Sequence, residues 1–329
     1  MPVPRKKLLE LARSEVLQRS QQEDLLSSFM IGSAVQGQPF LGDTADIDLV
    51  LIHPTEQKQF REIIRLSHQV HLDILHYGQH IFSQPRTLRI DPWLGPAIAE
   101  PGYLYDPEHF FERVQASVRG QFYRPDFSLQ RARGFLDLAG QHQALMLISN
   151  RWQQHYLHAI THAANAILSC EGKPESGRGW LKALRQRLQT LDDVETYNGI
   201  LQLCGIWESP EWDFAALCAA FQRSCKKALQ RSGMQPAARG RFEYLSGGVE
   251  GLLAMQEQRA AAWLLLTSWE KLLHQDGAAA SQDESAPFKT LLEHAQLTDQ
   301  SREQRKDVLA RYLKYIETRV LEWGQRAGA

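Results

Sequence analysis

The sequence predicts an α+β protein: a small α/β domain with a mixed sheet over residues 1–117, followed by an all-α domain over residues 118–329. Two observations predict this division. Short runs rich in β-branched and apolar residues alternate with helical stretches through the first domain. Beyond about residue 118, long segments with helical periodicity dominate. The length of 329 residues also suits roughly two domains of about 150 residues each.

The elements of the first domain can be assigned in chain order. An amphipathic helix occupies the start of the chain, and its one broad apolar face carries Leu8, Leu9, Leu11, Ala12, Val16 and Leu17. Pro54-Thr55 is a helix start signal, and the spacing of apolar residues predicts a helix over 55–67. The expected strands are LLSSFMI (25–31), IDLVLIH (47–53), QVHLDILHY (69–77) and a short GYLYD (102–106).

The second domain reads as a series of helices separated by polar breaks. The last helix carries one apolar stripe, and Ser301 with Gln304 predicts a capping box at its start. The breaks fall at 171–179, 231–240 and 276–287, and the third is expected to be a flexible surface loop. The expected helices are 128–149, 151–170, 178–191, 211–230, 241–273 and 301–326.

Composition excludes several classes of protein. Apolar residues make up 43% and charged residues 23%, which argues against wholesale disorder. With 37 basic and 38 acidic side chains, the chain is no basic nucleic-acid coat. The four cysteines form no C-x-x-C pair, which argues against a zinc ribbon or a disulfide scaffold. No apolar run approaches the roughly 18 residues of a membrane helix, so we expect a cytoplasmic protein with no membrane partner.

One constellation of residues carries chemistry. Gly32-Ser33 follows the first strand, and Asp46 and Asp48 lie at the start of the second. Side chains alternate along a strand, so these two carboxylates share a face, about 6–7 Å apart. Asp73 lies on a third strand and can share that face if the strands are adjacent. Three carboxylates repel one another unless a cation lies among them, and oxygen ligands of this kind suit Mg²⁺.

This pattern resembles the signature of the polymerase β-type nucleotidyltransferase superfamily, and within it the minimal and kanamycin nucleotidyltransferase group. The matching residues are Gly32, Ser33, Asp46, Asp48 and Asp73. The resemblance implies an enzyme that moves a nucleoside monophosphate from a nucleoside triphosphate, expected to be ATP, to a hydroxyl acceptor. It implies two Mg²⁺ ions held by the three aspartates, which are also the catalytic residues, and in-line displacement at the α-phosphate. Gly32 and Ser33 are the implied nucleotide-binding residues.

The acceptor cannot be read from these motifs. A surface that neutralises nucleic-acid phosphates should be more basic than this helical half. A small molecule or a protein is therefore favoured over nucleic acid, and the helical domain is expected to select the acceptor or bind a partner.

A second interpretation assigns the activity to the helical half. Arg151, His155, His158 and His162 share one helix face. Arg151 and His158 also resemble the Arg-x(4–6)-His pattern of the HEPN ribonucleases, which pair with minimal nucleotidyltransferases. The alternative function is thus a toxin–antitoxin-like interaction protein or a HEPN-type ribonuclease. A partly buried polar helix face with no catalytic role accounts for the same residues and is favoured over the functional interpretations.

Overall fold

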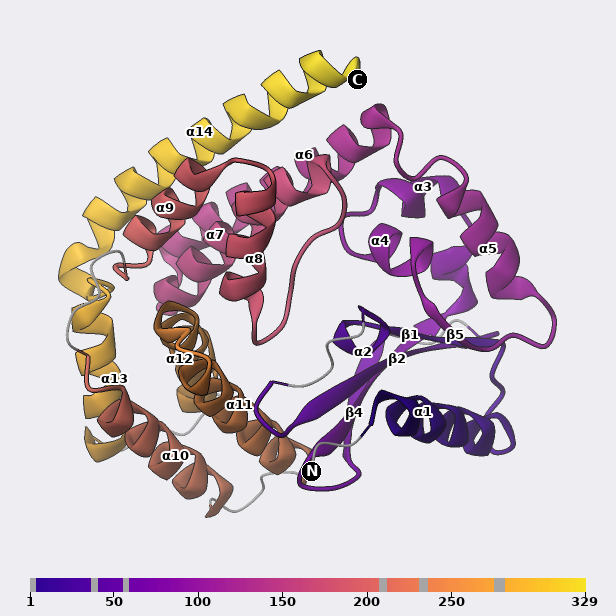
Figure 1. Cartoon of the computed structure of the whole chain (residues 1–329), viewed down its shortest axis with the longest axis horizontal. Coiled ribbons are helices and arrows are strands. Elements are labelled where there is room, and N and C mark those ends of the chain that lie inside the picture. The colour runs from indigo at the N-terminus through magenta and orange to yellow at the C-terminus, as the bar shows by residue number, and fades with distance from the viewer. Residues whose placement is uncertain (1–3, 37–40, 56–58, 207–211, 231–235, 275–281) are drawn as a thin grey trace. The chain divides into compact units, whose positions relative to one another are not determined.

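The computed structural model of the chain describes residues 4–36, 41–55, 59–206, 212–230, 236–274 and 282–329 (Figure 1). Its residues form two compact units. The first comprises Met1–Phe127 together with Gln235–Gly247, and the second comprises Ser128–Met234 with Gly248–Ala329. The sequence pattern put a single boundary between residues 117 and 118. No local pattern reveals that the distant segment 235–247 belongs with the first unit.

The first unit is built on one five-stranded sheet with the order β3-β4-β2-β1-β5. The two central strands β2 and β4 run parallel, while the remaining neighbours pair antiparallel. The sheet is therefore mixed, and with its helices it confirms the predicted α+β class. The strands are β1 (Ser27–Ile31), β2 (Ala45–His53), β3 (Phe60–Arg65), β4 (Val70–Gly78) and β5 (Gly102–Tyr105).

Helices cover both faces of this sheet (Figure 1). Helix α1 (Arg5–Ser20) packs Leu8, Ala12 and Val16 against one set of alternating residues of β2 and β4. The other set, including Val50 and Ile52, packs against the opposite layer. That layer contains η1 (Gln79–Phe82), α3 (Pro85–Ile90), α4 (Leu94–Ala99) and α5 (Phe110–Arg119). Alternation along the strands thus decides which face each side chain of β2 and β4 occupies.

The predicted helix over 55–67 is wrong. Residues Phe60–Arg65 form β3, which pairs antiparallel with β4 at the edge of the sheet; residues 56–58 lie outside the described part. An edge strand with both faces partly exposed shows no clean alternation of apolar and polar residues. Its two adjacent isoleucines, Ile63 and Ile64, therefore fit a helical spacing equally well, and pairing with β4 decides between the two.

The second unit is all-α. The predicted continuous helix 241–273 is two helices, because Gln256 adopts a left-handed conformation (φ +60°) and ends the first of them. No helix among the described residues has the length and apolarity to cross a membrane. The helices are α6 (Pro125–Ile148), α7 (Trp152–Cys170), α8 (Trp180–Thr190), α9 (Val194–Leu203), α10 (Phe214–Gln230), α11 (Pro236–Ala254), α12 (Gln258–His274), α13 (Gln282–His294), η2 (Asp299–Ser301) and α14 (Arg302–Ala327).

Four further points about this half need correction. Helix α9 was not expected, and α13 begins inside the segment 276–287 that was expected to be a loop. Helix α11 likewise begins within the expected break 231–240, of which residues 231–235 lie outside the described part. The capping box is also wrong: the hydroxyl of Ser301 donates to the carbonyls of Gln296 and Thr298 instead of capping α14.

Candidate active site

The three predicted aspartates lie on one face of the sheet. Asp46 and Asp48 are two residues apart on β2, so both project to the same side. In the parallel pairing of β2 with β4, Asp48 is the register partner of Asp73, and Asp46 is the partner of His71. Neighbouring strands are about 4.8 Å apart. The register therefore brings the carboxylates of Asp48 and Asp73 side by side, with that of Asp46 one step along the strand.

The carboxylates differ in their surroundings. Asp73 is 4% exposed and Asp46 is 8% exposed, whereas Asp48 is half-buried. His71 is fully buried beside Asp46, with Nδ1 3.8 Å from a carboxylate oxygen. The ring of Tyr244 in α11 meets the ring of His71 edge-on. Through Tyr244, helix α11 therefore contacts the sheet near the start of β2 and β4.

Sequence reasoning missed one residue of this site, Arg61 on β3. Its guanidinium binds Asp73 through two hydrogen bonds, from Nε to Oδ1 (2.5 Å) and from Nη2 to Oδ2. The hydrogen bond to Asp73 raises the pKa of Arg61, although burial opposes this; the charges of Asp73, Asp48 and Asp46 raise it further. The guanidinium thus interacts electrostatically with all three carboxylates. The assignment of 55–67 to a helix hid this residue, since only a strand next to β4 carries Arg61 to the aspartate face.

Gly32 adjoins the aspartates from β1. Strand β1 ends at Ile31, the register partner of Asp48, and Gly32 follows with φ +75°. A Cβ on Gly32 would collide with the carboxylate of Asp48. Both the left-handed backbone and the close approach require glycine at this position. Ser33 follows as the first residue of the short helix α2 (Ser33–Gln36), so the structure brings four of the five predicted site residues together and puts Ser33 next to them.

The donor set fits a hard divalent cation. All three predicted ligands offer carboxylate oxygens, the ligand type that Mg²⁺ prefers. The structure also contains a cation at this cluster, because the guanidinium of Arg61 neutralises Asp73. Asp46, Asp48 and Asp73 are therefore the residues that would hold Mg²⁺, and Arg61 competes for the same oxygens.

The residues of the alternative interpretation lie in the second unit. Arg151 is the N-cap residue of α7, and His155, His158 and His162 lie within that helix. His142 of α6 joins them: its Nδ1 is 3.0 Å from Nδ1 of His155, and its ring contacts those of His158 and His162. Burial, together with His142, lowers the pKa of His162 to about 4. Imidazole rings packed against one another make up this helix face.

Comparison with known proteins yields a distant likeness to a solved structure. No protein-family model matches the sequence, and no curated protein matches it. The chain is similar to a solved structure of a nucleotidyltransferase-like protein from Exiguobacterium sibiricum, with 13% sequence identity over 90% of this chain and 91% of that chain. The TM-score is 0.30, too low to assign this chain an activity. The function proposed next rests on the carboxylates alone.

Proposed function

We propose that this chain is a Mg²⁺-dependent nucleotidyltransferase. It moves a nucleoside monophosphate from a nucleoside triphosphate, with ATP as the expected donor, to a hydroxyl group of an acceptor. The observation that carries the proposal is the register of β2 with β4, which aligns Asp48 with Asp73 and keeps Asp46 on the same face. The backbone of Gly32 lies directly against the carboxylate of Asp48, in space that any side chain at this position would take.

The aspartates have separate tasks in this reaction. Asp46 and Asp48 would hold both metal ions, and Asp73 would complete the site of one of them. Bound Mg²⁺ supplies positive charge where the attacking and leaving oxygens become negative. The acceptor oxygen bonds to the α-phosphorus, the bond to the bridging oxygen of the β-phosphate breaks, and pyrophosphate leaves. Asp73 is positioned to take the proton of the acceptor hydroxyl. Gly32 and Ser33 contact the triphosphate.

Arg61 must release Asp73 before Asp73 can serve the acceptor. Both carboxylate oxygens of Asp73 accept hydrogen bonds from the guanidinium, so neither is open to the acceptor hydroxyl until Arg61 moves. The side chain of Arg61 is 49% exposed and belongs to an edge strand, so it has room to swing toward solvent or toward a phosphate. Arg61 therefore neutralises Asp73 until substrate and metal arrive.

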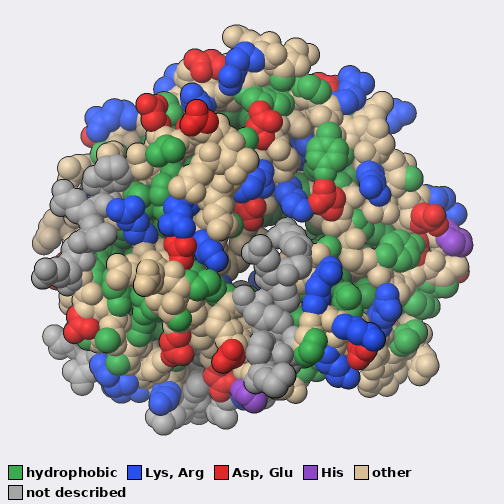
Figure 2. Space-filling model, in the orientation of Figure 1, with side chains coloured by type: hydrophobic (Ala, Val, Ile, Leu, Met, Phe, Trp, Pro, Cys, Tyr) green, Lys and Arg blue, Asp and Glu red, His purple; other side chains and the backbone are tan. Residues whose placement is uncertain are grey.

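The acceptor is expected to be a small molecule or a protein. On the face drawn in Figure 2, basic and acidic side chains of the described residues are interspersed over the surface. A protein that binds nucleic acid through its phosphates commonly gathers Lys and Arg on one face or along one helix. The mixed charge of this face supports an acceptor other than nucleic acid.

Transfer of label from the donor tests this function. The purified chain is incubated with ATP, GTP, CTP or UTP labelled at the α-phosphate, with Mg²⁺ and fractions of a cell lysate separated into small molecules, proteins and RNA. We expect label to pass to a small-molecule or protein fraction, to be absent when ATP labelled at the γ-phosphate is used, and to stop with EDTA. Label arriving from the γ-phosphate, or in no fraction with any donor, overturns the proposal.

A further inference from the structure

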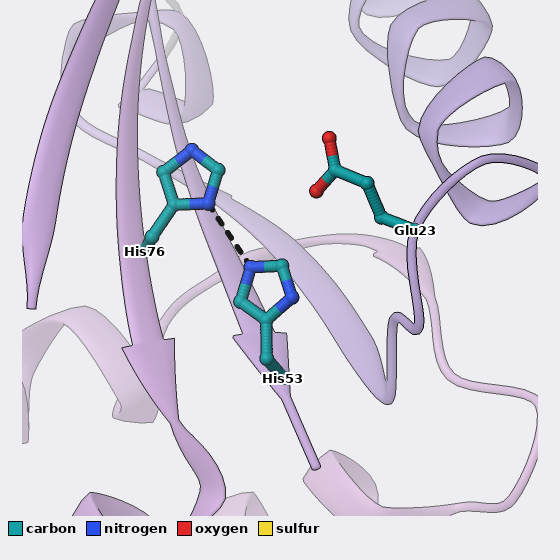
Figure 3. Close-up of side chains that lie close together, drawn as sticks. All are labelled: Glu23, His53 and His76. Atoms are coloured by element: carbon teal, nitrogen blue, oxygen red, sulfur yellow. Dashed lines mark hydrogen bonds between the residues drawn. The ribbon is translucent and has the colours of Figure 1, made fainter. Parts of the chain in front are cut away.

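A second cluster of potential ligands lies at the other end of β2 and β4. His53 is the last residue of β2, His76 lies near the end of β4, and Glu23 follows α1. Alternation puts both histidines on the α1 face, opposite the aspartates. Along β2, His53 is about 16 Å from Asp48 at 3.3 Å per residue. One ligand atom from each of Glu23, His53 and His76 lies within 4.8 Å of the other two (Figure 3).

Nδ1 of His53 lies 3.2 Å from the backbone carbonyl of Asp24, and Nε2 of His76 lies 3.4 Å from the carboxylate of Glu62. A carbonyl can only accept, so Nδ1 of His53 donates to Asp24 and its Nε2 carries a lone pair. The inner nitrogens, Nε2 of His53 and Nδ1 of His76, are 3.0 Å apart. An N–H of His76 can bridge them; when the proton of His76 lies on Nε2 instead, both inner nitrogens offer lone pairs to a metal ion.

Both rings are 2% exposed. Their inner nitrogens lie close together inside the protein, and imidazole nitrogens are the commonest metal ligands in proteins.

The surrounding charges also favour a divalent cation. The guanidinium of Arg19 contacts three carboxylates, those of Glu15 (2.7 Å), Glu23 (3.1 Å) and Glu62 (3.0 Å). One positive charge faces three negative charges, so the cluster has an excess of two. A cation of charge +2 beside Glu23 balances this excess.

Access is provided by a cavity of about 610 Å³ that borders the cluster and is also lined by Thr55 and Phe60. The ring of Phe60 stacks on that of His76, with centroids 3.9 Å apart. This contact fixes the orientation of the His76 ring, which is nearly parallel to that of His53, and the cavity leaves room for a water ligand. Figure 3 shows the carboxylate of Glu23 directed toward the two rings from the loop after α1.

We propose that Glu23, His53 and His76 bind one Zn²⁺ ion, with water as the fourth ligand. Two imidazole nitrogens and a carboxylate oxygen are a ligand set that Zn²⁺ accepts and Mg²⁺ does not prefer. With bonds of about 2.0–2.1 Å, tetrahedral ligands lie about 3.3 Å apart, close to the observed nitrogen separation. Nδ1 of His53 donates to the carbonyl of Asp24, and Nε2 of His76 faces the carboxylate of Glu62; a carbonyl and a carboxylate are the usual partners of the outer nitrogens of metal-bound histidines. The ion ties the loop after α1 to the ends of β2 and β4.

Metal binding to the full chain tests the site. The protein is stripped with EDTA, exchanged into buffer, and titrated with Zn²⁺ and Co²⁺ while metal content, visible absorption and thermal unfolding are followed. We expect one Zn²⁺ to bind per chain and to raise the midpoint of thermal unfolding. Bound Co²⁺ should give absorption bands typical of four or five ligands, and these bands should disappear when Zn²⁺ is added. His53→Gln, His76→Gln and Glu23→Gln should each weaken binding about 10-fold or more. His68→Gln and Glu10→Gln, at exposed positions, are the matched controls and should bind as wild type.

The two sites are distinguished by Asp48→Asn, which removes the proposed nucleotidyl transfer and should leave Zn²⁺ binding unchanged. If His53→Gln or His76→Gln fails to fold, the Co²⁺ spectrum of wild type and the Glu23→Gln titration decide. Binding that is non-stoichiometric, equally strong for Mg²⁺, or unaffected by the ligand substitutions overturns the proposal.

Discussion

Asp48 and Asp73 are register partners across the parallel strands β2 and β4, so two carboxylates 25 positions apart in sequence project side by side. Adjacent carboxylates that are both ionised repel each other at close range. Arg61 offsets part of this repulsion by binding Asp73 from the neighbouring strand β3. The balance between the carboxylates and this guanidinium is the basis of the first three predictions.

Asp46→Asn and Asp48→Asn should abolish nucleotidyl transfer and weaken Mg²⁺ binding, while thermal stability stays equal or rises. Each change removes one repelling charge and one metal ligand. Asp43→Asn, at an exposed turn position before β2, is the control and should keep wild-type nucleotidyl transfer and Mg²⁺ binding. Calorimetric titration with Mg²⁺ and thermal unfolding in EDTA measure the two effects, and near wild-type transfer in either site variant would contradict the assignment.

Arg61→Ala should lower the Mg²⁺ concentration needed for half-maximal transfer, because the competing cation is gone. Without metal the variant should lose about 1–2 kcal/mol of stability, since buried Asp73 loses its partner across a half-exposed bridge. Saturating Mg²⁺ should restore most of this loss. Arg65→Ala on the same strand breaks an ion pair with Glu243 and should cost at most about 1 kcal/mol, independent of Mg²⁺. An unchanged Mg²⁺ requirement in Arg61→Ala would refute competition.

Asp73→Asn should reduce the rate of transfer at saturating nucleotide far more than it reduces affinity for the triphosphate. Its proposed task concerns the acceptor oxygen, which gains importance only in the transition state. Rapid-mixing measurements of a single turnover, together with equilibrium binding of the nucleotide, separate these quantities. Loss of nucleotide binding with normal turnover at saturation would reverse the assignment.

Gly32→Ala should be damaging for two reasons, the left-handed backbone and the collision of its Cβ with Asp48. We expect a loss of about 1–3 kcal/mol, together with weaker Mg²⁺ binding, because Asp48 must move. Gly140→Ala is the matched control: a Cβ there meets no described atom within 4 Å. Within helix α6 this change should gain up to about 1 kcal/mol. Urea unfolding of both variants gives the comparison.

The histidine face of the second unit predicts a pH dependence of stability. Burial lowers the pKa of His162 to about 4, below its ordinary value of 6.5, so the unfolded chain binds a proton at a higher pH than the folded one. Stability should therefore fall as the pH decreases from about 6.5 to about 4. His162→Gln should narrow the difference between urea midpoints at pH 7 and pH 5, and His68→Gln, at an exposed position, should not. Equal differences in all three proteins would contradict this.

Much of the fold was predictable because its strongest signals are local. The apolar runs around Ile47 and Ile74 predict the central strands, and the two-residue spacing of Asp46 and Asp48 predicts their common face. The edge strand β3 was not predictable in this way, since its residues pack weakly and their pattern fits two structures. Arg61 was missed with it. The approach of Tyr244 to His71 depends on long-range packing that no local pattern encodes.

The strand β3 sends adjacent residues to opposite faces of the sheet: Arg61 toward the aspartates, and Phe60 and Glu62 toward the histidines. A one-residue slip of this strand against β4 would exchange these faces. It would carry an arginine to the histidine pair and a glutamate to the aspartates. Substitutions can change the exposed side chains of β3 without shifting its pairing. Insertion or deletion of one residue within β3 would instead impair the aspartate cluster and the histidine cluster at once. This strand should therefore tolerate substitution far better than any change in its length.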